Sequence, residues 1–217
     1  MSFHDRTDAG KQLAAALAGY AGKDCVILAL PRGGIPVAAE IAFALHAPLD
    51  VLLVRKIGAP QQPELAIGAV VDGGAPVFVR NKELLRLTGT GEREFNAIAR
   101  QELAEIERRR RLYLQSGTPL DPKGRIAIVV DDGIATGATM RAALQATRMR
   151  SPKELVLAVP VAAAETLEAL RGEADRIVCL ATPEPFGAVG YFYDDFDQVT
   201  DGEVIEALTR ARMRIGT

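Results

Sequence analysis

The chain has 217 residues, of which 48% are hydrophobic and 25% are charged. This composition is close to that of an average soluble globular protein, and it excludes a disordered chain, a collagen-like repeat and a coiled coil. The formal net charge is −2, so no bulk positive field exists to attract phosphate backbones, and we expect no nucleic-acid partner.

The cysteines and the apolar runs limit the class of protein further. Cys25 and Cys179 each lie inside an apolar run, which predicts buried thiols rather than a disulfide framework or a zinc site. The first residues are charged and lack the apolar region of a secretory signal. The longest uncharged apolar run, residues 155–164, is too short to span a bilayer and contains Pro160. We therefore expect a cytoplasmic protein with no membrane partner.

Short apolar runs rich in Val, Ile and Leu alternate with helical periodicity along the chain. Because these runs are continuous, they are typical of strands buried on both faces of a parallel sheet. The predicted strands cover residues 25–30, 49–54, 126–131, 155–160 and 176–181. Helical stripes fall between them, for example at Val37, Ile41 and Leu45. The pattern predicts an α/β fold with a doubly wound, mostly parallel sheet flanked by helices, whose functional loops lie at the carboxyl ends of the strands.

Two segments interrupt this alternation. Residues 66–71 and 76–79, joined by the Asp-Gly-containing turn 72–75, predict a β-hairpin. Residues 92–114 predict a long helix that ends in four consecutive arginines, residues 108–111. We interpret these arginines as a solvated face near the carboxyl end of the helix, where cations suit the helix dipole.

The clearest chemical signal is the stretch of residues 126–140, IAIVVDDGIATGATM. A buried strand ends in two carboxylates, Asp131 and Asp132, and a loop of small residues then precedes a helix. The unpaired N–H groups and partial positive charge of a helix amino terminus suit a dianionic phosphate. Gly137 allows close approach of the backbone, and the hydroxyls of Thr136 and Thr139 add donors. This loop is therefore a candidate phosphate site.

The two acids require a different ligand, because carboxylates repel a phosphate. As acceptors they suit a pair of hydroxyl groups, or a magnesium ion that bridges to such groups. A phosphate cradle beside two hydroxyl-binding acids matches a ribose 5-phosphate. The stretch has neither the Gly-Lys-[Ser/Thr] ending of a P-loop nor the G-x-G-x-x-G of a dinucleotide fingerprint.

This stretch resembles the phosphoribosyl-diphosphate signature of the type I phosphoribosyltransferases. The resemblance implies that Asp131 and Asp132 hold the ribose 2- and 3-hydroxyls, act in catalysis and contact Mg²⁺. It also implies that the 5-phosphate is bound by Ala135, Thr136, Gly137, Ala138 and Thr139. It covers the scaffold from about residue 25 to 194 and implies that family's fold, with a small hood and, here, a helical insertion.

Two further loops resemble diphosphate-binding parts of the family. Residues 30–34, Leu-Pro-Arg-Gly-Gly, resemble the short pyrophosphate loop, where backbone N–H groups and the Arg side chain meet the diphosphate. Residues 55–60 resemble the Arg-Lys-x-Gly start of the mobile loop in adenine-type members, and Glu64 further along is a candidate acid-base group. We expect this loop to close over the site and exclude water. The implied substrate contacts are Arg32, Gly33, Gly34 and Lys56.

A third resemblance lies near the carboxyl end. Residues 186–194 resemble the hood of hypoxanthine-guanine phosphoribosyltransferases, which implies that Phe186 stacks on the acceptor and that Asp194 binds Mg²⁺. The alternative is a core aromatic cluster with surface acids. The chain departs from the six-oxopurine enzymes, because Ala135 stands where they carry an acid and residues 159–163 lack their Lys. With its long insertion, the chain looks like the large, poorly assigned group of bacterial members.

These observations predict one domain over residues 1–217. We expect a core at about 25–181, a mobile loop and hairpin at about 56–80, a helical insertion at about 81–114, and a hood at about 182–200 with the N-terminal helix. No added DNA-binding helix pair is recognisable. A homodimer is implied only by the resemblance.

The predicted function is Mg²⁺-dependent transfer of a phosphoribosyl group from 5-phosphoribosyl 1-diphosphate to an unidentified nitrogenous acceptor, by resemblance a nucleobase, with release of diphosphate. The alternative is a binding module that senses the same sugar diphosphate without turnover. A hydrolase is disfavoured, because the chain has no G-x-S-x-G elbow and its paired acids lack the Asp-x-Asp spacing of aspartyl phosphatases.

Overall fold

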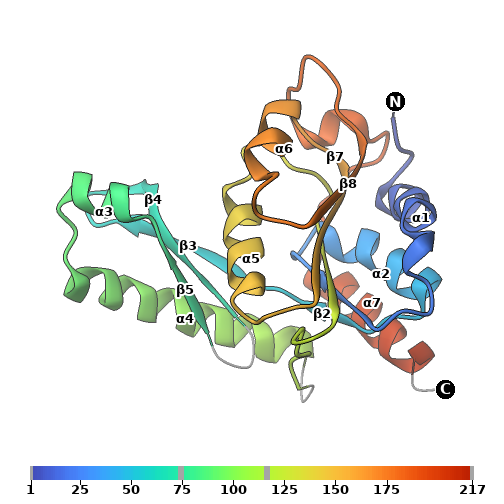
Figure 1. Ribbon diagram of the computed structural model, residues 1–217, viewed down its shortest axis with the longest axis horizontal. Helices are drawn as coiled ribbons and strands as arrows, with labels where there is room; N and C mark the ends of the chain where they lie inside the picture. The colour runs from blue at the N-terminus through green and yellow to red at the C-terminus, as the bar shows by residue number, and fades with distance from the viewer. Residues whose placement is uncertain (1, 73–75, 115–117, 216–217) are drawn as a thin grey trace.

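The computed structural model describes residues 2–72, 76–114 and 118–215. Its body is a five-stranded parallel sheet in the order β2-β1-β6-β7-β8, with helices on both faces (Figure 1). The strands are β1 (Cys25–Ala29), β2 (Leu49–Val51), β6 (Ile126–Val130), β7 (Glu154–Val161) and β8 (Arg176–Ala181). All five lie within or close to the predicted strands, and the predicted fold class is confirmed.

The body helices are amphipathic covers for this sheet. They are α1 (Arg6–Ala16), α2 (Gly34–Leu45), α5 (Ala138–Arg148), α6 (Ala164–Leu170) and α7 (Asp201–Ile215), with short 3-10 turns η1 (Ala18–Tyr20) and η2 (Val189–Phe192). Alternate residues of β1 point to opposite cores: Ile27 packs with α1, α2 and α7, whereas Val26 and Leu28 pack with α5. The sheet is therefore buried on both faces, as its continuous apolar runs predict.

The chain leaves the parallel sheet earlier than predicted after β2. The predicted strand over residues 49–54 ends at Val51, and the N–H of Leu53 donates to the buried carboxylate of Asp72 at 2.8 Å. A side-chain acceptor replaces the next strand as the partner of this backbone group. Val54 then begins a strand of a second sheet.

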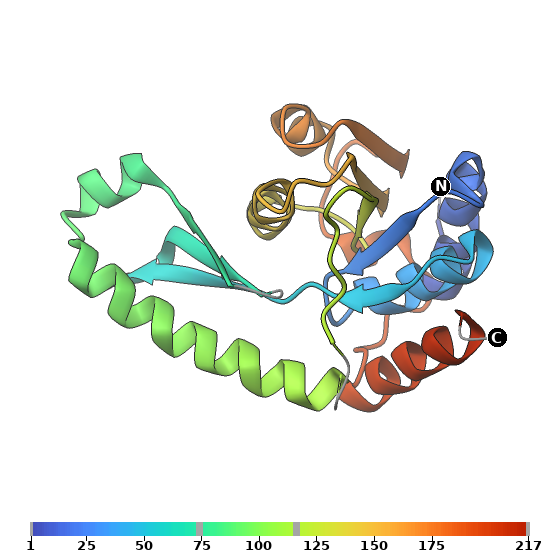
Figure 2. The same ribbon diagram turned by 60° about the horizontal axis from the view of Figure 1, so that its bottom comes forward.

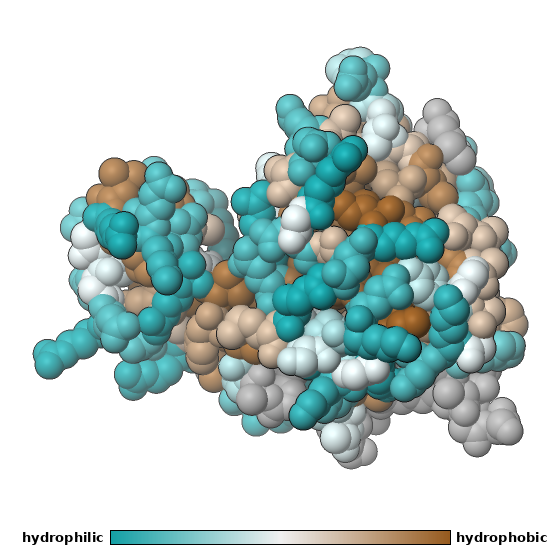
Figure 3. Space-filling view, viewed as in Figure 1, coloured by the Kyte–Doolittle hydropathy of each residue, from teal (hydrophilic) through white to brown (hydrophobic). Residues whose placement is uncertain are grey.

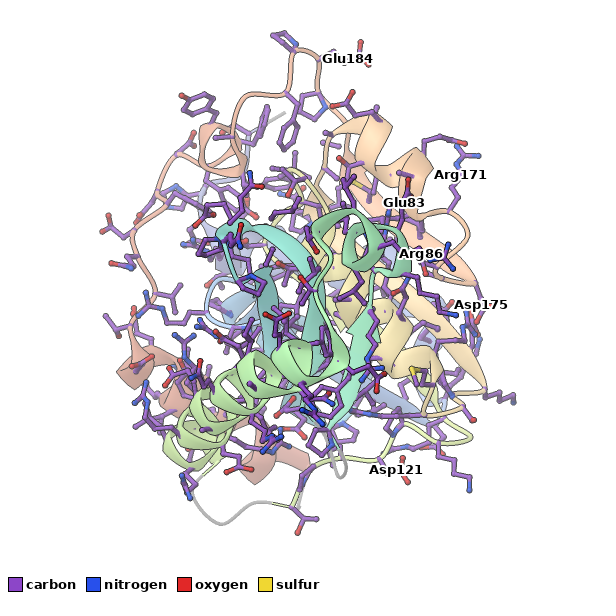
Figure 4. The ribbon with its side chains drawn as sticks, turned by 90° about the vertical axis from the view of Figure 1, so that its left-hand side faces the viewer. Glu83, Arg86, Asp121, Arg171, Asp175 and Glu184 are labelled. Atoms are coloured by element: carbon purple, nitrogen blue, oxygen red, sulfur yellow. The ribbon has the colours of Figure 1, made fainter. Side chains whose placement is uncertain are left out.

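This second sheet and two helices form an arm that projects from the body (Figures 1 and 2). Its strands β3 (Val54–Ala59), β4 (Gln62–Val71) and β5 (Val77–Arg80) are antiparallel, in the order β3-β4-β5. The helix α3 (Lys82–Thr88) lies at the far end of the arm, where Figure 4 labels its Glu83 and Arg86. The helix α4 (Glu92–Leu114) returns along the arm to the body and ends beside α7.

The arm confirms two predictions and changes a third. The helix over residues 92–114 has the predicted bounds, and β4 and β5 pair as the predicted hairpin, whose turn residues 73–75 lie outside the described residues. The segment from Lys56 onward, expected as a loop, is instead two paired strands joined at Pro60 and Gln61. Gly58 permits this pairing, because a Cβ there would collide with the backbone of Pro63.

The arginines at the end of α4 are not a uniformly solvated face, so that interpretation was wrong. The guanidinium of Arg110 pairs with the buried carboxylates of Asp50 and Asp72, and its side chain is only 16% exposed. Asp50 and Asp72 belong to the body and to the junction with β4, so this arginine fastens α4 where the arm meets the body. The run of four charges gave no sign that one of them would be buried in this way.

Hydrophilic and hydrophobic residues are unevenly distributed over the face that Figure 3 shows. Figure 3 shows that the visible side of the arm is largely hydrophilic, with hydrophobic residues at its tip and near the body; Leu87 of α3 is exposed. Cys25 is buried, as predicted, and Cys179 is half-buried; both thiols are free. Within the described residues, no helix has both the length and the apolar character that a membrane crossing requires.

Candidate active site

The candidate site lies at the carboxyl edge of the parallel sheet, where the loops after β1, β2 and β6 meet. A pocket of about 130 Å³ opens there. It is lined by Leu30, Pro31, Leu52, Leu53, Val54, Arg55, Ile106, Arg109, Asp131 and Thr139. The edge at which these loops converge is where parallel α/β sheets bind ligands.

Two glycines bring the loop after β1 against the acid pair. A Cβ on Gly33 would overlap the carboxylate of Asp132, and a Cβ on Gly34 would crowd the carbonyl of Val130 and the backbone of Asp131. Only glycine therefore allows this close approach. The structure places the predicted pyrophosphate loop directly beside the predicted ribose-binding acids.

The two acids have different surroundings. Asp131 Oδ1 accepts a hydrogen bond from the N–H of Asp132 at 2.9 Å, and Asp132 Oδ2 accepts one from Arg6 Nε at 2.7 Å. Burial, together with the adjacent negative charge of Asp132, raises the pKa of Asp131 well above its usual value. A bound cation or a pair of hydroxyl donors would offset this cost of keeping Asp131 ionised.

Arg6 and Tyr193 are site residues that the sequence analysis missed. Arg6, in the first turn of α1, pairs with Asp132 through a half-buried contact, donates to the carbonyl of Asp197 at 2.8 Å and lies over the ring of Phe196. The hydroxyl of Tyr193 donates to the carbonyl of Asp132 at 2.6 Å. No motif surrounds Arg6, and 126 positions separate it from its partner, so only the fold reveals this contact.

The predicted phosphate loop has the shape of an anion cradle. Gly137 has a φ of +75° and caps α5, and a Cβ there would strike the methyl group of Thr166. Thr166 Oγ1 fixes the loop by donating to the carbonyl of Ala135 at 2.6 Å. The N–H of Arg141 donates to the carbonyl of Gly137, whereas those of residues 135–139 donate to no group in the described part of the chain. These amides are therefore open to an anion.

The predicted cationic residues occupy different positions. Arg32 lies beside the first residue of α7, with Nη1 3.9 Å from Asp201 Oδ1. Lys56 Nζ donates to Glu64 at 2.7 Å, and this bond lowers the pKa of Glu64, whose side chain is 90% exposed. Neither Lys56 nor Glu64 lines the pocket. Arg55, the residue before Lys56, lines the pocket instead.

Comparison with known proteins identifies the family. The profile described as "Phosphoribosyl transferase domain" matches residues 3–195. The chain belongs to this phosphoribosyltransferase family. The predicted resemblance is thereby confirmed.

The relatives of this phosphoribosyltransferase domain include a Mycobacterium tuberculosis protein named "Putative phosphoribosyl transferase Rv0571c", which is 48% identical over 209 residues. That alignment covers 96% of this chain and 47% of the relative, so the chain spans about half the length of the curated relatives it matches. The crystal structure of TT1426 from Thermus thermophilus is 42% identical, with a TM-score of 0.86, over 97% of this chain and 99% of that one.

A more distant structure shows the same fold alone. It is a hypothetical protein from Neisseria gonorrhoeae with bound ppGpp, which has a TM-score of 0.51 at 14% identity and covers 98% of this chain and 99% of that one. The fold therefore extends over nearly the whole chain in both comparisons.

The hood of this phosphoribosyltransferase domain packs on its N-terminal segment. Phe186 lies against Phe192, with ring centroids 5.2 Å apart, next to a buried cluster that contains Phe3 and Tyr193. Asp194 is exposed and accepts a hydrogen bond from Ser2 at 2.7 Å. The aromatic residues thus pack with one another beside a surface acid, as in the alternative interpretation, while the roles of Phe186 and Asp194 at the acceptor and the metal stay predictions.

The acid pair fits a magnesium ion only in part. The described residues include no group of three or more His, Cys, Asp or Glu side chains placed to hold a metal. However, Mg²⁺ is usually held by one or two protein carboxylates, and substrate phosphates and water complete its shell. Asp131 meets this requirement, because its side chain is partly buried, lines the pocket and forms no ion pair among the described contacts. Asp132 could share the ion only by loosening its bond to Arg6.

Proposed function

We propose that the chain is a Mg²⁺-dependent phosphoribosyltransferase that binds 5-phosphoribosyl 1-diphosphate and transfers its phosphoribosyl group to a nitrogenous base, with release of diphosphate. The observation that carries this proposal is the geometry of residues 131–139. Two carboxylates at the end of β6 are followed by a loop whose five backbone amides are open, at the start of a helix. A phosphorylated ribose has the matching groups, a dianion and a neighbouring diol.

Each part of the sugar diphosphate has a proposed place. The 5-phosphate binds the amides of residues 135–139 and the hydroxyls of Thr136 and Thr139, and the ribose hydroxyls donate to Asp131 and Asp132. The diphosphate lies along residues 31–34, near the Arg32 side chain. Mg²⁺, when bound at Asp131, supplies positive charge that steadies the diphosphate as it leaves.

The residues of this chain would act mainly by holding charge in place. As the bond from the ribose to the diphosphate breaks, positive charge develops on the sugar and negative charge on the leaving group. Asp131 and Asp132 would lie beside the positive charge on the sugar, and Arg32 beside the negative charge on the diphosphate. Removal of one such charge contact typically costs about 3 kcal/mol in the transition state, roughly a hundredfold in rate.

A module that binds the sugar diphosphate without turnover is the second candidate. The ion pair between Arg6 and Asp132 does not separate it from the transferase, because a carboxylate bound to a guanidinium is a weaker acceptor for ribose hydroxyls or a metal in either case. The two candidates differ in one readout. An enzyme releases diphosphate when a suitable base is added, whereas a sensor binds the sugar diphosphate tightly and releases none.

Calorimetric titration with 5-phosphoribosyl 1-diphosphate and Mg²⁺ tests the site itself. We expect saturable binding by the wild type and none by the Asp131→Asn, Asp132→Asn double variant, which keeps nearly the same side-chain volume. A double variant that binds with wild-type affinity would refute the site. Diphosphate release with a panel of nucleobases then separates the transferase from the sensor.

A further inference from the structure

One face of α4 runs along the candidate site. Glu102, Ile106, Arg109 and Tyr113 follow one another at intervals of four, three and four residues, so their side chains share one side of the helix. Ile106 and Arg109 line the pocket that also contains Asp131. The insertion helix, which comes from the arm, therefore supplies part of the wall of a site built on the body.

Arg109 is oriented by its own helix. Its Nε donates to Glu105 at 2.8 Å, which leaves the two terminal amino groups of the guanidinium without a partner among the described residues. Arg55 on β3 has the same arrangement: its Nε donates to Glu102 at 2.7 Å, and its side chain lines the same pocket. The pocket thus contains two guanidinium groups, each held at one edge by a carboxylate of α4.

These two groups match an anion with several oxygens. Arg55, Arg109 and Asp131 are the charged residues that line the pocket, and the carboxylates that hold the two arginines, those of Glu102 and Glu105, are not among the lining residues. Pro31, the residue before Arg32 in the predicted pyrophosphate loop, lines the same pocket, so the loop that carries Arg32 borders the two guanidinium groups. A planar guanidinium can donate two parallel hydrogen bonds to phosphate oxygens.

We propose that Arg109 binds the diphosphate group of the substrate, together with Arg32 and Arg55, so that α4 completes the site. The inference rests on the proposed function, because it takes the sugar diphosphate as the ligand. The 5-phosphate has its own cradle in residues 135–139 and does not need Arg109. The role assigned to α4 is therefore specific to one end of the substrate.

The chain offers a matched control for this role. Arg108 Nε lies 2.7 Å from the same carboxylate, that of Glu105, but the Arg108 side chain is 61% exposed and is not among the residues that line the pocket. Arg108→Gln and Arg109→Gln each remove one positive charge, together with two hydrogen bonds to Glu105 in the first variant and one in the second. Only the second removes a guanidinium from the pocket.

The test is calorimetric titration of the wild type, Arg108→Gln and Arg109→Gln with three ligands in the presence of Mg²⁺. The ligands are 5-phosphoribosyl 1-diphosphate, inorganic diphosphate and ribose 5-phosphate. We expect Arg109→Gln to weaken the first two by roughly tenfold to hundredfold and to leave ribose 5-phosphate unchanged. Arg108→Gln should bind all three as the wild type does. Arg109→Lys, which keeps the charge but loses the planar fork, should give a smaller loss than Arg109→Gln.

Two results would overturn the inference while the proposed function stands. One is Arg109→Gln binding the sugar diphosphate with wild-type affinity. The other is Arg109→Gln losing affinity for ribose 5-phosphate by the same factor, which would place the contact at the wrong end or reveal a damaged fold. A wild type that binds none of the three ligands would instead remove the proposed function itself.

Discussion

The body and the arm contribute to the same site in different ways. The body supplies loops at the ends of β1 and β6, in which glycines and acids next to one another in sequence are also next to one another in space. The arm supplies single side chains from a helix, such as Arg109. The residues on either side of Arg109 in the sequence do not line the pocket. Groups held by strand-end loops therefore form local motifs, whereas groups delivered by docking of a helix do not.

Arg109 and Arg110 show how sharp this difference is within the arm. Arg110 is buried between two carboxylates and fixes the helix, while Arg109 remains partly exposed and lines the pocket. A helix turns by about 100° per residue, so adjacent residues face different surroundings. We therefore expect substitutions of Arg110 to lower stability by loosening the contact of α4 with the body, and substitutions of Arg109 to weaken ligand binding.

Loss of docking should give the largest change in stability. Arg110→Ala removes the guanidinium that pairs with the buried carboxylates of Asp50 and Asp72, and Arg150, which donates to the backbone carbonyl of Asp72, remains near them. Removal of one partner of a buried ion pair costs about 3 to 5 kcal/mol, and we expect a loss near the lower value because Arg150 remains. Urea unfolding at pH 7 measures this effect. Arg108→Ala, at an exposed position, should change stability by no more than about 0.5 kcal/mol. Equal effects of the two variants would contradict the docking role.

The same variant has an expected dependence on pH. Burial already raises the pKa of Asp72, and loss of Arg110 should raise it further, because the guanidinium opposes the effect of burial. A carboxyl whose pKa is higher in the folded state than in the unfolded state takes up protons on folding. The free energy of unfolding of the protein therefore falls as the pH rises. The deficit of Arg110→Ala relative to the wild type should therefore shrink as the pH is lowered from 7 toward 5. A deficit that grows on acidification would be inconsistent with buried, unpaired carboxylates.

The next largest effect should come from a substitution in the body that prevents the close packing of Gly33 against Asp132. Gly33→Ala places a methyl group on the carboxylate of Asp132, so either the pyrophosphate loop or the acid must move. Such overpacking costs about 1 to 3 kcal/mol in stability, and we expect binding of the sugar diphosphate to weaken by roughly a hundredfold. Gly172→Ala, at a position with open space around it, is the control and should leave binding unchanged.

The sequence predicted those parts of the molecule that rest on local patterns. The five parallel strands, α4 and the hairpin all follow from apolar runs, helical periodicity or an Asp-Gly turn. The position of the acid pair at the end of β6, and of the small-residue loop at the start of α5, follows from the order of acids, glycine and threonines after a strand. Each of these signals lies within about fifteen residues, where chain geometry fixes the relation between side chains.

The missed features depend on contacts between distant segments. Arg6 meets Asp132 from the other end of the chain, and Arg110 meets Asp50 across the junction of arm and body. Nothing in the composition near either arginine distinguishes it from an exposed one. The strands at Lys56 were missed for a related reason, since a Gly- and Pro-marked segment also suits a loop when its pairing partner is unknown.

The smallest effect concerns the contact between the end of α4 and α7. Tyr113 is buried and its hydroxyl donates to Asp201 at 2.7 Å, while the Asp201 side chain remains about half exposed. Tyr113→Phe should lower the free energy of unfolding by about 1 kcal/mol at pH 7. Burial, followed by the bond to Asp201, raises the pKa of Tyr113 to about 12. The tyrosine thus retains its proton in the folded state above the pH at which the unfolded chain loses it.

This contribution to stability should be constant below about pH 10, the usual pKa of tyrosine, and should disappear as the pH approaches 12. The control is Thr200→Ala, which removes the two capping bonds that the Thr200 hydroxyl forms with Glu203 at the start of the same helix and also costs about 1 kcal/mol. Its effect should not change between pH 10 and 12, because neither group titrates there. If Tyr113→Phe shows the same flat profile, the hydroxyl does not join α4 to α7, and Arg110, with apolar packing, carries the attachment of this helix.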